Sequence, residues 1–233
     1  MAHPLDASSG RVDRADFDLR DFIEHTLLAP FATAGDLEQL CLQAQRYRFP
    51  AVCVAPCHVG QAVELLYNEA CEVYTVIGFP SGTALTATKR FEAQAAIDQG
   101  AQGLDVVINL GWLRDRDLDP LHRELAEICE LAQKPVKAIL EMAQLTDEEK
   151  RTAAEICLDA GVTYLKTSTG WMGGASVADV KLLRSIVGDR VGIKASGGIK
   201  DYHQAVELIR AGANRLGTSR GVYLMQMQEQ LGE

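Results

Sequence analysis

The chain has 233 residues, of which 47% are hydrophobic and 6% aromatic. This length suits one α/β barrel, and the composition supports a large, mainly aliphatic core. The 23 Lys and Arg residues against 32 Asp and Glu residues give a formal charge of −9. A charge of that sign repels nucleic acid and anionic membranes, so we expect neither as a partner.

Signals for export, membrane insertion and metal binding are weak in the sequence. Residues 1–20 have no apolar signal-peptide core, and no run of 18 apolar residues occurs. The six scattered cysteines favour free thiols in a reducing compartment, so we expect a cytoplasmic protein. Cys53, Cys57 and His58 suggest zinc, but no second ligand pair follows at a suitable spacing. We therefore expect no metal.

Short apolar runs alternate with amphipathic stretches from Phe22 onward. We expect residues 1–21 to form an N-terminal arm and residues 22–233 to form one domain. The expected strands are residues 22–28, 51–55, 73–79, 104–109, 136–142, 164–168, 192–196 and 215–219. The expected helices are residues 33–47, 58–69, 85–99, 120–132, 146–160, 177–187, 202–211 and 221–230. Eight strand–helix pairs predict a single (β/α)₈ TIM barrel, and their regularity favours it over an open doubly wound sheet.

One spacing recurs in three of the strand–helix pairs. A glycine that closes a helix is followed four residues later by a leucine, and the next residue is unusual for a strand. The three segments are 98–105, 159–166 and 210–217, and their last residues are Asp105, Lys166 and Gly217. Glycine suits the left-handed conformation that ends helices, so the constant offset places these three residues at comparable heights in different strands.

Charged residues are expected inside the barrel. Side chains alternate across a strand, so leucines that face the helices leave Asp105 and Lys166 facing inward. The same alternation directs Lys137, Glu141 and Lys194 inward. Barrel centres are normally filled by branched apolar residues, and charges near the C-terminal ends of strands belong to the catalytic face. The alternative is a buried salt-bridge network that only fixes strand register.

Two lysines and an aspartate suit carbonyl chemistry. A lysine amine is nucleophilic only when neutral, which for a reference pKa of about 10.4 is roughly one molecule in a few thousand at pH 7. Burial and a neighbouring positive charge both favour the neutral amine. We therefore interpret Lys166 as the nucleophile, Lys194 as its cationic neighbour and Asp105 as a proton-transfer group. A protonated imine is its own electron sink, so we expect no cofactor.

Two loops suit an anionic substrate. Residues 196–200 and 217–221 follow the last two expected strands, and both combine glycine with hydroxyl side chains. Loops at these places, leading into a helix N-terminus, are the usual phosphate site of such barrels. Lys200, Ser219 and Arg220 add side-chain donors. A single Gly-Gly pair more often marks a simple turn. The presence of two such loops at these places favours a phosphate site.

The residues described above resemble those of the deoxyribose-phosphate aldolase family of class I aldolases. The likeness covers about residues 22–222, and its motifs are Lys166-Thr-Ser-Thr-Gly170, Lys194-Ala-Ser-Gly-Gly-Ile199, His25-Thr-Leu-Leu28, Ala51-Val-Cys-Val-Ala-Pro56, Val76-Ile-Gly-Phe-Pro80, Asp105-Val-Val-Ile-Asn109 and Leu216-Gly-Thr-Ser219. The resemblance implies a TIM barrel that reversibly cleaves 2-deoxy-D-ribose 5-phosphate to acetaldehyde and D-glyceraldehyde 3-phosphate.

The resemblance also implies residue roles. Lys166 would form the Schiff base, Lys194 would favour its neutral form and aid proton transfer, and Asp105 would join the proton relay. The implied contacts with substrate hydroxyls and phosphate are Glu24, Thr26, Thr169, Gly170, Gly197, Gly198, Gly217, Ser219 and Arg220. The expected partners are a small phosphorylated sugar, aldehydes and further copies of this chain, with a two-fold dimer as the first expectation.

The sequence departs from the family pattern in several places. Ala29 and Arg220 replace a common lysine and a small residue, Glu141-Met-Ala-Gln144 stands where Glu-Thr-Cys-Leu is frequent, and the loop at residues 171–173 is slightly short. The tyrosine-bearing tail of some members is also lacking. We expect effects on substrate preference more than on reaction type. The alternatives are a Schiff-base lyase or transaldolase-like enzyme for another phosphosugar, and a non-catalytic phosphosugar-binding barrel.

Overall fold

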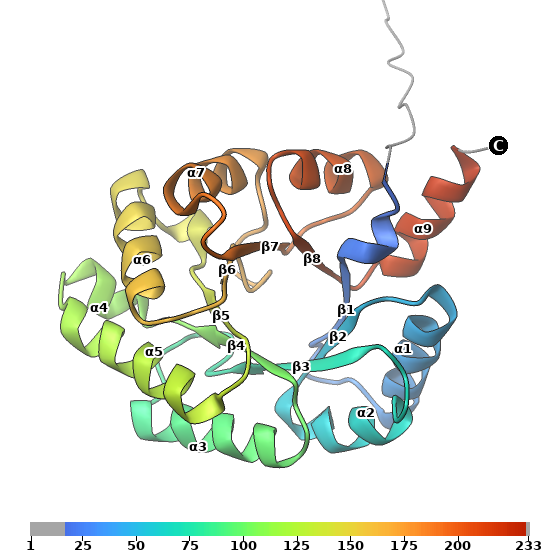
Figure 1. Cartoon of the computed structure of the whole chain (residues 1–233), viewed down its shortest axis with the longest axis horizontal. Helices are drawn as coiled ribbons and strands as arrows, with labels where there is room; N and C mark the ends of the chain where they lie inside the picture. The colour runs from blue at the N-terminus through green and yellow to red at the C-terminus, as the bar shows by residue number, and fades with distance from the viewer. Residues whose placement is uncertain (1–16, 232–233) are drawn as a thin grey trace, which may run out of the picture.

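The computed structural model describes residues 17–231, which form a closed barrel of eight parallel strands surrounded by helices (Figure 1). The strand order around the barrel follows the chain, and the last strand pairs with the first through Ile23 and Leu216. This pairing confirms the predicted (β/α)₈ TIM barrel and excludes the open sheet. Among the described residues, no helix is long and apolar enough to cross a membrane.

All eight predicted strands are present, and most end earlier than expected. They are β1 (Ile23–Leu27), β2 (Ala51–Val54), β3 (Glu72–Ile77), β4 (Gly103–Val107), β5 (Val136–Ile139), β6 (Tyr164–Lys166), β7 (Gly192–Ser196) and β8 (Arg215–Thr218). The largest difference is at β5, which was expected to reach Met142. Glu141 adopts a left-handed conformation with φ of 52°, which cannot continue a strand.

The eight predicted helices are also present. They are α1 (Ala34–Tyr47), α2 (Val59–Leu65), α3 (Thr86–Asp98), α5 (Leu118–Ala132), α6 (Asp147–Asp159), α7 (Val177–Val187), α8 (Tyr202–Arg210) and α9 (Gly221–Gln230). The unexpected helix is α4 (Leu110–Arg114), where the Asn109 side chain caps two backbone N–H groups. Three short 3₁₀ turns complete the described elements: η1 (Leu19–Phe22), η2 (Pro56–His58) and η3 (Met142–Gln144).

The end of the predicted N-terminal arm packs against the barrel. Leu19 on η1 is fully buried, and its backbone N–H donates to Gln228 on α9 at 3.0 Å. Gln228 also donates to the Phe17 carbonyl at 2.8 Å. Residues 1–16 of the predicted arm lie outside the described residues, so the boundary at residue 21 stays a prediction.

The core has two parts, as strand alternation predicts. The larger part lies between barrel and helices and includes Leu104, Leu165 and Ile193. The smaller part lies inside the barrel and consists of Ala51, Cys53, Tyr74 and Val76, with Leu28 and Phe79 packed on it. The barrel interior is therefore apolar along β2 and β3, and this leaves the other strands to carry its charges.

Two strand glycines make room for tyrosine rings inside the barrel. A Cβ atom on Gly103 would lie 2.0 Å from a ring carbon of Tyr74, and one on Gly192 would lie 2.1 Å from a ring carbon of Tyr164. The Tyr74 ring in turn lies 3.1 Å from the Lys137 amine, measured to the ring centroid. The glycine on β4 therefore helps to set the position of a buried charge.

Replacing Gly103 tests this packing. Gly103→Ala would force the Tyr74 ring off its position, and we expect the free energy of unfolding to fall by about 1–3 kcal/mol, as is typical of overpacking. Gly35→Ala is the matched control, because its nearest neighbour would be 3.8 Å away and alanine favours helix by up to about 1 kcal/mol. Urea denaturation measures both changes. Equal stabilities of the two variants would contradict the packing argument.

Candidate active site

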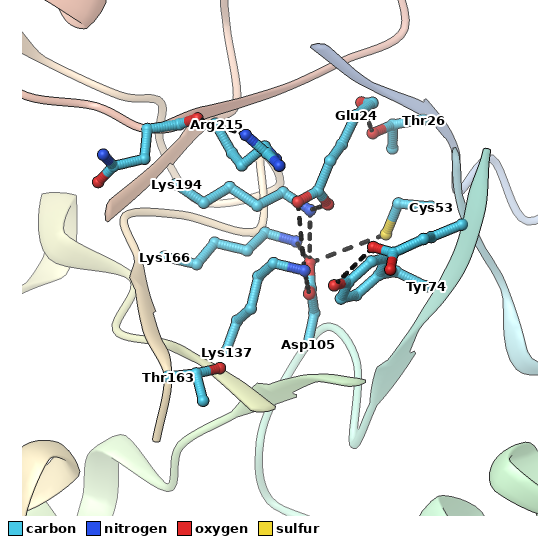
Figure 2. A network of polar contacts seen from close by, with 12 residues as sticks. Glu24, Thr26, Cys53, Tyr74, Asp105, Lys137, Thr163, Lys166, Lys194 and Arg215 are labelled. Atoms are coloured by element: carbon cyan, nitrogen blue, oxygen red, sulfur yellow. Dashed lines mark hydrogen bonds and ion pairs between the residues drawn. The ribbon is translucent and has the colours of Figure 1, made fainter. Parts of the chain in front are cut away.

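Five charged side chains from five strands meet inside the barrel (Figure 2). They are Glu24 on β1, Asp105 on β4, Lys137 on β5, Lys166 on β6 and Lys194 on β7, and each is at most 2% exposed. We call these five residues the charge cluster. The three lysines and Asp105 lie inside the barrel, as strand alternation predicts.

Asp105 is the centre of the charge cluster. Its Oδ2 atom accepts hydrogen bonds from the Lys166 amine at 2.8 Å and the Lys194 amine at 2.7 Å. Lys166 and Lys194 are directly paired on adjacent parallel strands, so both side chains reach the same oxygen from one side. The structure therefore brings together the three residues predicted to be catalytic.

Glu24 is the second carboxylate of the charge cluster. Its Oε2 atom accepts a hydrogen bond from Lys194, and its Oε1 atom lies 3.2 Å from the Lys137 amine. The resemblance assigned Glu24 to a substrate hydroxyl, whereas here its carboxylate is engaged with two buried amines. A direct contact between Glu24 and the substrate stays a prediction.

Lys137 was predicted to face inward but was not assigned to the site. Its amine lies 3.2 Å from both Asp105 and Glu24, in ion pairs that lack the alignment of hydrogen bonds. The Tyr74 ring supplies a further cation–π contact. The alternating pattern of residues 136–142 contained the signal for a third interior lysine. Lys137 is the least tightly hydrogen-bonded amine of the charge cluster.

The charge cluster does not balance when fully ionised. Three ammonium groups and two carboxylates sum to +1, and an unbalanced buried charge is costly. Burial raises the pKa of Asp105, but Lys137, Lys166 and Lys194 outweigh this effect and hold that pKa well below its usual range. Burial likewise opposes the attraction of Lys137 and Lys194 for Glu24, whose pKa is also lowered. Both carboxylates are therefore ionised at neutral pH.

The amines differ in how firmly they hold their protons. Burial lowers the pKa of Lys194, but Asp105 and Glu24 outweigh it and raise that pKa well above the usual value. Burial dominates for Lys137, whose pKa is lowered despite the same two carboxylates. Lys194 is thus the fixed ammonium of the charge cluster. Of these two amines, Lys137 is the one that gives up its proton more readily than a free lysine does.

A pocket of about 430 Å³ opens beside Lys166. The predicted substrate contacts that line it are Thr26, Thr169, Gly170, Gly197, Gly198, Gly217, Ser219 and Arg220. The pocket thus connects the Lys166 amine with both glycine-containing loops, 196–200 and 217–221. Asp105 and Lys194 stay buried in the charge cluster, so Lys166 joins the cluster to the pocket.

The glycines of the pocket allow two loops to interlock. Gly170, Gly197 and Gly198 have φ of 88°, 86° and 69°, which side chains other than glycine rarely adopt. A Cβ atom on Gly197 would lie 2.9 Å from the Gly170 Cα atom. The backbones of the two loops therefore approach each other closely here. On the neighbouring loop, the Arg220 guanidinium donates to the Lys200 carbonyl at 3.2 Å.

The departures from the family pattern lie around the pocket. Ala29 and Trp171 line it. Trp171 is 57% exposed and meets Phe79 edge-on, with ring centroids 6.3 Å apart. Trp112 is only partly buried and packs against the outer core. Of the two tryptophans, Trp171 is therefore the one that shapes the pocket wall.

The zinc-like grouping of the sequence is separated in space. Cys53 lies inside the barrel, with its sulfur 3.8 Å from Asp105 Oδ2, and Cys57 is exposed on η2. Burial, with Asp105 and Glu24 nearby, raises the pKa of Cys53 despite Lys194 and Lys166. Within residues 17–231, no three His, Cys, Asp or Glu side chains are grouped as a metal site requires.

A barrel that places a buried lysine pair beside a pocket is typical of enzymes that act through a lysine. The chain belongs to the DeoC/LacD family of aldolases, whose family model matches residues 16–224. A deoxyribose-phosphate aldolase from Microcystis aeruginosa is 60% identical over 215 residues, which cover 92% of this chain and 96% of that protein. The predicted resemblance is thereby confirmed.

Solved structures agree with this assignment. A Coccidioides immitis protein, provisionally named a deoxyribose-phosphate aldolase, has a TM-score of 0.89 at 36% identity, covering 91% of this chain and 85% of its own. The deoxyribose phosphate aldolase of Aeropyrum pernix, described as a tetramer, has a TM-score of 0.85 at 33% identity, covering 91% and 92%.

The charge cluster predicts a specific pH dependence of stability. The folded-state pKa values of Asp105 and Glu24 are lowered, so both groups stabilise the fold above their unfolded values of about 4, and this contribution is lost as pH falls through the folded values. Asp105→Asn should cost about 3–5 kcal/mol at pH 7, because it leaves buried amines uncompensated. The variant should then lose less stability than the wild type between pH 7 and pH 3.

Urea denaturation at a series of pH values measures this dependence. Asp115→Asn serves as the control, because Asp115 is exposed and its replacement should leave the wild-type curve unchanged. Parallel curves for the wild type and Asp105→Asn would show that Asp105 is not a main source of acid sensitivity.

Proposed function

We propose that this chain is a class I aldolase that reversibly cleaves 2-deoxy-D-ribose 5-phosphate to acetaldehyde and D-glyceraldehyde 3-phosphate. The observation that carries the proposal is the position of Lys166. Its amine donates to Asp105 within the charge cluster, and the same residue lines a pocket that is also lined by the two glycine loops. The names of the family relatives support the substrate.

The first steps use Lys166 as nucleophile. Its neutral amine adds to the aldehyde carbon of the open-chain sugar to give a carbinolamine, which takes up one proton from the charge cluster or water and loses water to give a protonated imine. This cation draws electrons from the bond between carbons 2 and 3, while the hydroxyl on carbon 3 gives up its proton. That bond breaks, glyceraldehyde 3-phosphate leaves, and an enamine remains on Lys166. Protonation of the enamine carbon and hydrolysis of the imine then release acetaldehyde.

Proton transfer belongs to the rest of the charge cluster in this proposal. Asp105 contacts Lys166 and Lys194 through one oxygen and Lys137 through the other. The carboxylate can therefore pass a proton between Lys166 and Lys137, directly or through water. Lys137 is the suitable acceptor because its pKa is lowered. Lys194 keeps its charge and contributes to the lowered pKa of Lys137.

The phosphate group is assigned to the two glycine loops, with substrate hydroxyls at Thr26 and Thr169. Helices α8 and α9 follow these loops, and their N-termini attract anions. Lys200 and Arg220 add positive charge at the pocket rim of a chain whose formal charge is −9. Local focusing of positive charge explains how an acidic protein binds an anionic sugar.

We also propose a cytoplasmic homo-oligomer, with a two-fold dimer as the first expectation. The six cysteines of the chain are free thiols, which suits a reducing compartment. The tetramer of the Aeropyrum pernix relative supports self-association of some kind. Light scattering of the purified protein measures the assembly directly.

The decisive experiment traps the imine. The protein is reduced with borohydride in the presence of acetaldehyde, and mass spectrometry locates the modified lysine. We expect a reduced adduct of about 28 Da on Lys166, no adduct in Lys166→Met, and loss of deoxyribose phosphate cleavage in that variant by at least about 10³-fold, since the nucleophile is gone. Lys134→Met, at an exposed site, should behave like the wild type.

Other outcomes distinguish the alternatives. An adduct on a different lysine would refute the assigned nucleophile. Trapping without cleavage of deoxyribose phosphate, but with cleavage of another sugar phosphate, would favour a related Schiff-base lyase. Thermal stabilisation by sugar phosphates without any adduct would favour a non-catalytic binding barrel.

Arg220 tests the phosphate assignment. We expect Arg220→Gln to raise KM for deoxyribose 5-phosphate about tenfold, because a charge-assisted hydrogen bond to phosphate contributes roughly 1.5–3 kcal/mol. Cleavage of unphosphorylated deoxyribose should change little. Arg210→Gln replaces an exposed arginine on α8 and is the control. An equal effect of Arg220→Gln on both sugars would count against a phosphate contact.

A further inference from the structure

Glu141 is a buried carboxyl group that the mechanism above leaves without a role. It is fully buried and lies just beyond the end of β5. Its φ of 52° places it in a conformation that is uncommon for residues other than glycine. Such a conformation persists where surrounding contacts hold it, and it is often found at functional sites.

The carboxyl group of Glu141 is directed to one residue of the β6–α7 loop. Its Oε2 atom accepts hydrogen bonds from the backbone N–H of Thr169, at 3.2 Å, and from the Thr169 hydroxyl. The other oxygen, Oε1, is buried and has no hydrogen-bond partner among the described residues. Every hydrogen bond that the Glu141 side chain makes within residues 17–231 therefore goes to Thr169.

Neighbouring contacts hold the same loop to the turn after β5. Gln144 on η3 donates to the Met172 carbonyl at 2.7 Å. Gly173 packs so closely on Ala143 that a Cβ atom there would lie 2.3 Å from the alanine Cβ atom. The β6–α7 loop that carries Thr169 is thus held by η3 as well as by Glu141.

These contacts leave the Thr169 hydroxyl with one free interaction. A hydroxyl group has one proton to donate and two lone pairs that accept. The proton is donated to Glu141, and one lone pair accepts the Trp171 N–H at 3.0 Å. One lone pair remains. Thr169 lines the pocket with Lys166 and Gly170, so it presents an acceptor, and no donor, to a bound molecule.

We propose that Glu141 is a positioning residue that fixes the Thr169 hydroxyl as an acceptor, which selects a substrate hydroxyl between the reacting carbonyl and the phosphate. The inference rests on the proposed function. Thr169 lines the pocket together with Lys166, which would hold the carbonyl, and with Gly170, whose Cα atom a Cβ atom on Gly197 of the proposed phosphate loop would approach to 2.9 Å. A remaining lone pair attracts an O–H group at that place, and it repels a carbonyl or phosphate oxygen.

Two reactions separate this role from a merely structural one. Cleavage of 2-deoxyribose 5-phosphate needs the substrate hydroxyl, whereas borohydride trapping of acetaldehyde on Lys166 does not. Glu141→Met keeps the side-chain length without an acceptor, and Thr169→Val keeps the shape without a hydroxyl. We expect each to lower kcat/KM for cleavage about five- to tenfold, which is the effect of one lost hydrogen bond, mainly through KM. The trapping rate should stay within about twofold of wild type.

Further variants test the link between the two residues. Glu141→Gln should recover most of the cleavage activity, because an amide oxygen can accept both hydrogen bonds. The double variant Glu141→Met/Thr169→Val should be no worse than Thr169→Val by more than about twofold, since both changes remove one interaction. Glu155→Met, at an exposed site on α6, controls for a glutamate-to-methionine change elsewhere.

Three results would overturn the inference. The first is an equal loss of cleavage and trapping in Glu141→Met, which indicates structural damage only. The second is losses that multiply in the double variant. The third is normal cleavage by Thr169→Val. If Glu141→Met fails to fold, Glu141→Gln and the comparison of Thr169→Ser with Thr169→Val still decide. Failure of the proposed function is distinct, because it appears in the wild type.

Discussion

The structure of this site depends on one carboxylate that three amines share. Without Asp105, the Lys137, Lys166 and Lys194 side chains would bring three positive groups together with Glu24 alone to balance them. The ion pairs come from strands on different sides of the barrel, so the charge cluster exists only when the barrel is closed. Closure of the fold and assembly of the proposed chemistry are therefore one event. A network built only for stability would gain little from such a cost in desolvation.

Alternation of side chains along the strands predicted which charged residues face the barrel interior. The constant offset from Gly100 and Gly161 placed Asp105 and Lys166 at the same level, and the structure agrees. Alternation says which face a side chain takes, but it does not say which partner the side chain meets. The contacts of Glu24 with Lys194 and Lys137 could be predicted only with the strand pairing around the whole barrel known. The weaker hydrogen bonding of Lys137 likewise depends on the angles of its contacts.

The conformations of loops could not be predicted from the periodic spacing of apolar residues. Glu141 was placed inward by extending β5 to Met142, but the strand ends at Ile139, so its contact with Thr169 follows from a left-handed turn. Helix α4 has five residues, too few for a helical repeat to be visible. By contrast, the glycine loops were predictable, because close approach between backbones requires glycine, and the glycines are visible in the sequence. Their positions around the pocket agree with that prediction, whereas their binding of phosphate is part of the proposed function.

The uneven charge of the cluster fits the proposed reaction. A protonated imine carries the same charge as the ammonium it replaces, and an enamine carries the same charge as a neutral amine. During turnover, the cluster would therefore alternate between a total of +1 and zero, the same two states that proton loss from one amine creates. The raised pKa of Lys194 and the lowered pKa of Asp105 fix two members throughout. In the proposed mechanism the mobile proton would belong to Lys137 and the reacting centre, and the interior would hold each intermediate without a new uncompensated charge.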